Sequence, residues 1–158
     1  MQKRQELITR LERSRAIMLA HLDKVDKNRK IYPLWTIREI LAHLSGWDDA
    51  VISFVRTILE GGQPGLTVAA EGVDVYNAAT VSTREGLSYD QVYREYVQTR
   101  RILLDLLLQV PEEEITRAYV LPWGGYGTLE DLVRIFAPHE EEHAADIRNI
   151  VDAAEKKA

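Results

Sequence analysis

Two histidines stand four residues apart near the C-terminal end of the sequence, at His139 and His143. On a helix this spacing puts both imidazoles on one face, with Cβ atoms about 5–6 Å apart. Two imidazoles placed in this way can bind one divalent ion through bonds of about 2.0–2.1 Å. Leu132, Phe136 and Ile150 fall close to the same helical face, so we expect both histidines to point into an apolar core.

A third histidine, His43, lies far away in the sequence on a face that also holds Ile40, Trp47, Ala50 and Phe54. Three imidazoles from two segments, with one coordination position left open, form the ligand set of a catalytic metal site. A single histidine on an apolar face is more often a hydrogen-bonded core residue, and this interpretation stays open for His43. A buried neutral imidazole still needs a polar partner, and that need favours a shared site.

The run from His139 to His143 also fits H-E-x-x-H, the metalloprotease pattern in which a glutamate base lies between two zinc ligands. We disfavour that function, because the nearest downstream glutamate, Glu155, lies in a tail that is expected to fray. No accompanying sheet is predicted, and Glu141 is expected on a solvated face. Pro138 is expected to kink the helix and to set the angle of the ligand pair, or else to be a tolerated kink without function.

Four long helices are expected to position these side chains. Apolar residues recur at helical spacing over residues 3–25, 36–60, 88–110 and 128–154. Thr36 with Glu39, and Ser88 with Gln91, have the spacing of capping boxes, which satisfy free N–H groups at a helix start. No strand pattern and no internal repeat is recognisable. The sequence predicts one all-α domain over residues 1–158, organised as a four-helix bundle.

Two irregular stretches interrupt the helical pattern. Glycine and proline in residues 61–65 end the second helix, and a long connector then extends over 61–87 with a short helix at 74–79. A connector of this length can cross the bundle, so the second and third long helices need not be antiparallel neighbours. The second stretch, 112–127, contains a tight aromatic turn at 122–127.

Composition excludes several classes of function. The 158 residues include no cysteine, which excludes a disulfide scaffold, a thiolate metal site and a cysteine nucleophile. A net charge of −5 repels phosphate backbones, so no nucleic-acid partner is expected. No stretch approaches the roughly 20 apolar residues of a membrane span, and the first residues are too charged for a secretory signal. We expect a cytoplasmic protein of bacterial type with no membrane partner.

The segment from Trp35 to Leu44, followed by Trp47 and Asp48, resembles the W-[ST]-x-x-[DE]-[IL]-[IVL]-x-H-[IL] stretch of the damage-inducible DinB/YfiT-like superfamily. The aromatic turn at 123–127, Thr128-Leu129 and the later histidine pair resemble that family's C-terminal half. The motifs occur in the same order over nearly the whole chain. The resemblance implies a four-helix bundle with one metal-binding histidine on the second helix and two on the last.

On this resemblance His43, His139 and His143 are the ligands of a divalent zinc, nickel, iron or manganese ion. It also implies a homodimer and a role in the stress response. Members of the superfamily differ in chemistry: some are transferases or isomerases that depend on mycothiol or bacillithiol, and others resemble colibactin-resistance hydrolases. The segment from Gly72 to Ala78 loosely resembles a D-x-x-N segment of the thiol-dependent branch.

The predicted function is a metal-dependent enzyme, of thiol S-transferase, isomerase or hydrolase type. It would activate a water or a low-molecular-weight thiol for attack on a small electrophile. Glu140 or Asp48 is expected to accept a proton or to orient a ligand imidazole, unless each is an ordinary surface carboxylate. We place four residues at the entrance, where they would contact the bound molecule: Asn77, Trp47, Trp123 and Tyr126. The alternative is a non-enzymatic bundle that binds a small molecule or a partner, with a structural or adventitious metal.

Overall fold

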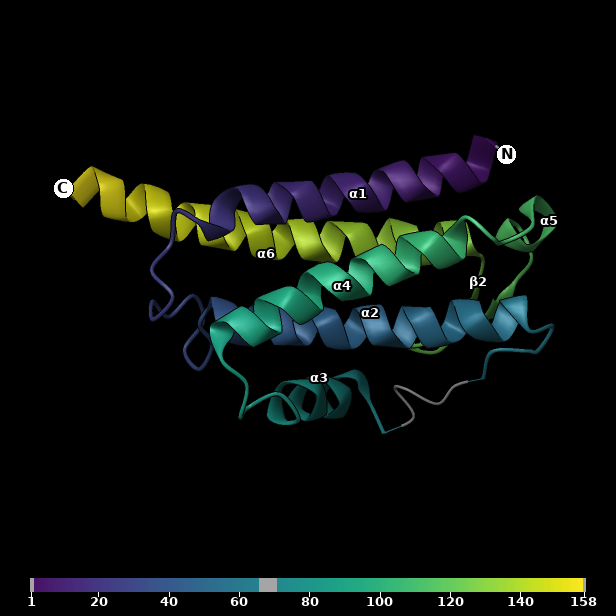
Figure 1. Cartoon of the computed structure of the whole chain (residues 1–158), viewed down its shortest axis with the longest axis horizontal. Coiled ribbons are helices and arrows are strands. Elements are labelled where there is room, and N and C mark those ends of the chain that lie inside the picture. The colour runs from purple at the N-terminus through teal and green to yellow at the C-terminus, as the bar shows by residue number, and fades with distance from the viewer. Residues whose placement is uncertain (1, 66–70, 158) are drawn as a thin grey trace.

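The computed structural model describes residues 2–65 and 71–157. In that part of the chain it contains six helices and a two-stranded antiparallel hairpin (Figure 1). In chain order the elements are α1 (Gln2–Leu22), α2 (Ile37–Leu59), α3 (Val73–Ser82), α4 (Tyr89–Leu107), α5 (Glu112–Ile115), β1 (Tyr119–Val120), β2 (Tyr126–Gly127) and α6 (Leu129–Lys157). The prediction of an all-α fold is confirmed: the four long helices are present, α3 lies where the short helix at 74–79 was predicted, and α5 was not predicted.

The four long helices lie side by side, with α1 packed on α6 and on α4, and α2 packed on α4 (Figure 1). Helices α2 and α4 run in the same direction. The connector between them therefore has to return the chain along the bundle, and α3 within it packs against α2. The predicted crossover is confirmed.

The capping boxes explain where two of these helices begin. The Thr36 N–H donates to a Glu39 carboxylate oxygen at 2.8 Å, and the Thr36 hydroxyl caps the first turn of α2. Ser88 and Gln91 exchange the equivalent bonds, at 2.8 and 3.2 Å, before α4. Both predicted helix starts are therefore confirmed within one residue.

Other boundaries differ from the prediction. Helix α1 ends at Leu22, three residues earlier than expected, and α6 runs unbroken through Pro138 and on to Lys157 instead of fraying after Ala154. The hairpin β1–β2 was not predicted, because two-residue strands are too short to show an alternating pattern. Its loop needs two left-handed residues, which are glycines with φ values of 97° and 77° at positions 124 and 125.

The interior consists of two clusters of buried apolar side chains. One surrounds Leu11, Val55 and Leu132, and the other surrounds Met18 and Leu41. The long helices also carry buried charged and polar residues next to these apolar ones. The sites described below are built from those charged and polar residues. In the part of the chain that the structure describes, no helix is both long enough and apolar enough to cross a membrane.

Candidate metal centre

The structure brings the three predicted metal ligands together, from helices α2 and α6. The Nε2 atom of His139 lies 3.3 Å from Nε2 of His43 and 3.2 Å from Nε2 of His143. One ligand nitrogen from each residue lies within 4.8 Å of the other two. His43 is buried, and the other two are partly buried. Three ring nitrogens therefore converge on one point at the edge of the core.

Two of the three nitrogen–nitrogen distances match those between ligands of one bound cation. Ligand atoms bound tetrahedrally at about 2.0–2.1 Å lie roughly 3.3–3.4 Å apart. The two Nε2–Nε2 distances to His139, 3.2 and 3.3 Å, are close to that value. A single nitrogen carries either one hydrogen or one lone pair, so His139 cannot make a full hydrogen bond to each neighbour. A metal ion uses all three lone pairs at once.

The electrostatic environment keeps these imidazoles neutral. Burial, together with repulsion from the other two histidines, lowers the pKa of His43 from 6.5 to about 3. Burial and the charge of His139 lower the pKa of His143 to about 4, and burial also lowers the pKa of His139. A neutral imidazole is the form that binds a metal. At neutral pH the three histidines are therefore uncharged.

Two residues that the sequence analysis missed hold His143 from outside. The Tyr32 hydroxyl lies 2.7 Å from His143 Nδ1 and donates to the Asp146 carboxylate at 2.6 Å. Tyr32 belongs to the polar segment between α1 and α2, and no spacing rule connects it with a residue more than a hundred positions away. By contrast, His43 Nδ1 is buried and has no hydrogen-bond partner among the described residues.

A cavity of about 500 Å³ opens beside the histidines. Its lining comes from α2, α3, the hairpin loop and α6: His43, Trp47, Val73, Asn77, Trp123, Arg134, Ile135, Phe136, Pro138, His139 and Glu142. Three of the four predicted contact residues are among them, and the Trp47 indole N–H donates to the Asn77 carbonyl oxygen at 2.7 Å. The cavity is thus walled mainly by aromatic and aliphatic groups, and Arg134, Glu142 and two metal-ligand candidates also lie on its surface.

Tyr126 is the predicted contact residue that does not line this cavity. Its side chain is 83% exposed. Successive residues of a strand face opposite sides, and the next residue, Gly127, faces the core. Tyr126 therefore points away from the cavity, while Trp123 in the hairpin loop reaches it.

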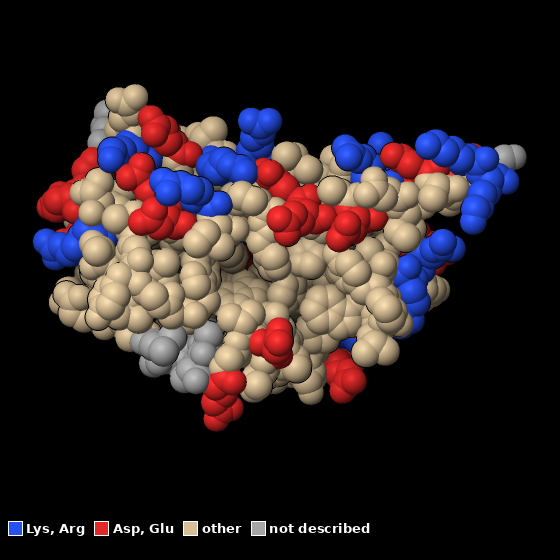
Figure 2. Space-filling model, turned by 180° about the vertical axis from the view of Figure 1, so that it is seen from behind, with Lys and Arg blue, Asp and Glu red and all other residues tan. Residues whose placement is uncertain are grey.

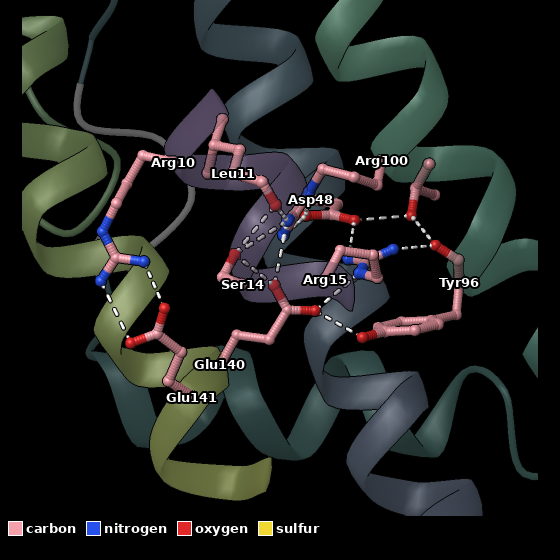
Figure 3. A network of polar contacts seen from close by, with 10 residues as sticks. Arg10, Leu11, Ser14, Arg15, Asp48, Tyr96, Arg100, Glu140 and Glu141 are labelled. Atoms are coloured by element: carbon pink, nitrogen blue, oxygen red, sulfur yellow. Dashed lines mark hydrogen bonds and ion pairs between the residues drawn. The ribbon is translucent and has the colours of Figure 1, made fainter. Parts of the chain in front are cut away.

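Asp48 and Glu140 belong to a buried network of ion pairs (Figure 3). Arg15 contacts Asp48 at 2.8 Å and Glu140 at 2.6 Å. Arg100 contacts the same two carboxylates at 3.0 and 2.9 Å. Thr99 and Tyr96 donate further hydrogen bonds, to Asp48 and Glu140 respectively. Each of the four long helices thus contributes one charged side chain, two positive and two negative.

These contacts determine what the two carboxylates can do. Burial alone would raise the pKa of Glu140, but Arg100, Arg15 and the Tyr96 hydroxyl lower it to about 2. A carboxylate with so low a pKa is a poor proton acceptor at neutral pH. Among the described contacts neither carboxylate is hydrogen-bonded to a candidate ligand histidine. The negative charge of Glu140 only offsets part of the lowering of the pKa of His139 and His143. The contacts favour a structural role, and proton transfer by either residue stays a prediction.

Several solved structures share this fold. A mycothiol-dependent maleylpyruvate isomerase is 15% identical, with a TM-score of 0.74 over 91% of this chain and 60% of that chain. The sibling lethal factor precursor DfsB is 21% identical, with a TM-score of 0.75 over 96% of each chain. The colibactin self-resistance protein ClbS, solved in complex with double-stranded DNA, is 13% identical, with a TM-score of 0.75 over 92% and 93%. At these identities the likeness shows a common fold.

A match to a protein family comes from the sequence itself. No curated protein matches the sequence at a significant level, and the chain spans only 60% of the isomerase's length. Residues 10–147, however, match the sequence model of the DinB superfamily, and this range includes all three candidate ligands. The chain belongs to the DinB superfamily.

Proposed function

We propose that the protein is a metal-dependent enzyme that attacks a small electrophile with a low-molecular-weight thiol or with water. The observation that carries this proposal is the convergence of three neutral imidazoles, from His43, His139 and His143, beside a cavity of about 500 Å³. A divalent metal held there lowers the pKa of a bound water or thiol and so supplies a nucleophile near neutral pH.

The cavity walls indicate what kind of molecule enters. Trp47, Trp123 and Phe136 offer aromatic surfaces, and Val73 and Ile135 extend the apolar surface to the exposed rim. These groups bury apolar area and exclude water from the reacting atoms. The Trp47 indole N–H donates to the side-chain oxygen of Asn77 on α3, and this hydrogen bond fixes the indole ring against the cavity. The substrate is therefore small, with an apolar part against these groups and its electrophilic atom close to the histidines.

A thiol is the nucleophile that we favour. The preference rests on the segment from Gly72 to Ala78, which resembles the D-x-x-N segment of the thiol-dependent branch, and the fold shared with a mycothiol-dependent isomerase is compatible with a thiol of the mycothiol or bacillithiol kind. A hydrolase that uses water fits the same histidines, and zinc, nickel, iron and manganese all bind imidazole. The nucleophile and the metal have to be identified by experiment, because three imidazoles alone do not select among these candidates.

Charge distribution bears on the partners of the protein. ClbS was solved with double-stranded DNA, but its fold alone does not carry that property to this chain. The net charge here is −5. On the face shown in Figure 2, Lys and Arg side chains gather at the upper edge among Asp and Glu, and the middle of the face is largely uncharged. We therefore propose a small-molecule partner in place of nucleic acid, and the homodimer that the sequence resemblance implies stays a proposal.

The first experiment measures metal content. Untagged protein would be purified and analysed for bound metals, together with His43→Ala and the matched control His21→Ala, which removes a histidine of α1 outside the cluster. We expect close to one divalent ion per chain in the wild type and the control, and at least a tenfold weaker affinity in His43→Ala. Equal metal affinity in all three proteins would refute the three-ligand site.

The second experiment separates an enzyme from a binding bundle. Metal-loaded protein would be incubated with a chloro-dinitrobenzene electrophile and several cellular thiols, and with an activated ester without thiol. Thiol-dependent product supports the proposed reaction, and thiol-independent ester loss supports the hydrolase. Metal binding without turnover in either assay favours the non-enzymatic alternative, in which the metal is structural or adventitious.

A further inference from the structure

A tight turn at residues 32–35 precedes α2 and contacts two of the metal-ligand candidates. The Trp35 carbonyl accepts hydrogen bonds from the N–H groups of Ile31 and Tyr32, at 2.9 and 3.2 Å, and the Trp35 N–H donates back to the Tyr32 carbonyl. The turn presents two aromatic rings inward. Tyr32 lies edge-on to His143 at a ring-centroid distance of 5.7 Å, and Trp35 lies 5.2 Å from the ring of His43.

The hydroxyl of Tyr32 has only one hydrogen, and its two neighbours decide where that hydrogen lies. The Tyr32 O–H donates to the Asp146 carboxylate oxygen at 2.6 Å, so its one hydrogen lies on that side. The Tyr32 oxygen can then accept a hydrogen bond, and its other neighbour is His143 Nδ1 at 2.7 Å. That nitrogen must therefore carry the hydrogen of the neutral imidazole. His143 Nε2 is left with a free lone pair that faces the other two histidines.

We infer that Tyr32 and Asp146 form a positioning relay that holds His143 in its metal-binding tautomer. The inference deepens the proposed function and rests on it for the identity of the ligand, but the tautomer itself is a property of the metal-free protein. The cavity side of the site is formed by His43 and His139, whereas His143 is not among the residues that line the cavity. The relay thus fixes the third ligand from the side opposite to the substrate.

The loss of the relay has a defined consequence. Without Tyr32 the hydrogen on Nδ1 loses its acceptor, and the other tautomer becomes favoured because its Nε2–H can donate to His139 Nε2 at 3.2 Å. That hydrogen occupies the lone pair that a metal needs. Removing a partner of this kind weakens metal affinity by about 10–100-fold in comparable sites.

The test compares Tyr32→Phe, Asp146→Ala and the double variant in a competition titration with Co²⁺ or Zn²⁺. Tyr119→Phe is the matched control, because it removes another tyrosine–carboxylate hydrogen bond, to Glu114, far from the histidines. Each single variant should weaken binding at least about tenfold, and the double variant little more than either, because the two residues act as one unit. The control should stay within about twofold. Unchanged affinity in Tyr32→Phe, or losses that simply multiply in the double variant, would overturn the relay.

A second measurement does not need any metal. Nitrogen-15 NMR of the histidine rings in metal-free protein reports which ring nitrogen of His143 carries the hydrogen. We expect Nδ1–H in the wild type and in Tyr119→Phe, and a shift to Nε2–H in Tyr32→Phe and Asp146→Ala. An Nε2–H form in the wild type would refute the relay. If the wild-type protein shows the Nδ1–H form but binds no metal, the proposed function fails and the relay stands.

Discussion

His139 lies between the two other candidate ligands, and its position shows how far residue spacing alone reaches. The i, i+4 pair and its apolar face were readable from the sequence, because a helix places both imidazoles on one side. That His43 meets them depends on the packing of α2 and α6, which spacing does not specify. Tyr32 was unpredictable for the same reason: its partners lie more than a hundred residues away, and a tyrosine in a polar turn has no distinguishing pattern.

The three histidines make stability depend on pH. Their usual pKa of 6.5 falls to about 3 for His43 and about 4 for His143 in the folded protein, so the unfolded chain binds more protons below pH 6.5. Stability should therefore be fully present above pH 6.5 and fall as the pH is lowered toward 4. The slope is up to about 1.4 kcal/mol per pH unit for each histidine. Urea unfolding of the metal-free protein between pH 7.5 and 5 measures this slope of stability against pH.

Replacing His43 provides the control for this pH dependence. His43→Gln should flatten the profile between pH 7.5 and 5, a range in which the buried carboxylate of Glu140, with its pKa of about 2, does not titrate. An equally steep profile in the variant would show that other groups cause the acid sensitivity.

Glu140 and its neighbour Glu141 provide a matched pair of substitutions. Glu140 is buried and contacts Arg15 and Arg100, whereas Glu141 is half-buried and contacts Arg10. Glu140→Gln leaves buried positive charge uncompensated and should destabilise the fold by about 3–5 kcal/mol. Glu141→Gln should cost less than about 1 kcal/mol. Denaturant unfolding measures both values.

The same pair tests the assignment of Glu140. Metal affinity, measured below the unfolding temperature, should change little in Glu140→Gln. A variant that keeps its stability but loses turnover would instead identify Glu140 as a catalytic base, as the H-E-x-x-H pattern suggests.

At the scale of elements, the capping signals in the sequence were reliable, whereas short elements and helix ends were not. The capping residues Thr36 and Ser88 predicted helix starts, because a cap is a contact between residues three apart. The hairpin and the four-residue helix α5 escaped prediction, because segments this short have no periodicity to detect. The predicted end of α6 was also wrong. The charged residues 155–157 were expected to fray, but they continue the helix to Lys157.

Helix α3 packs so closely on α2 that only glycine fits at position 46. A Cβ atom added to Gly46 would lie 2.4 Å from the Cβ of Thr80. Gly46→Ala should therefore push α3 outward and destabilise the fold by about 1–3 kcal/mol. The same shift disturbs the cavity, since α3 carries Asn77, the hydrogen-bond partner of Trp47. Thermal unfolding and tryptophan fluorescence measure these two effects.

A second substitution on α3 shows whether the close contact is the cause. Thr80→Gly removes all three side-chain atoms that the new methyl group would meet. The double variant Gly46→Ala/Thr80→Gly should then lose less stability than the sum of the single changes. Additive losses would mean that Gly46 is needed for another reason.

At the scale of the whole molecule, the core does not depend on the metal. Two apolar clusters and the network of four charges join all four long helices without contribution from the histidines. Metal removal by a chelator should therefore lower the melting temperature while the far-ultraviolet circular dichroism at 25 °C stays helical. The expected loss is about 2.7 kcal/mol if the metal was present at a hundred times its dissociation constant. An unfolded metal-free chain would identify the ion as structural.

The alternation of charge around the network restricts how the chain can misassemble. Arg15 and Arg100 each bridge Asp48 and Glu140, so an arrangement in which a cation-bearing and an anion-bearing helix trade places sets like charges against each other. Exchange of α1 with α4, which both carry arginine, incurs no such penalty. Exchange of α2 with α6, which both carry a carboxylate, incurs none either, so this protein has to avoid exchanges of like-charged helices by loop length and apolar fit alone.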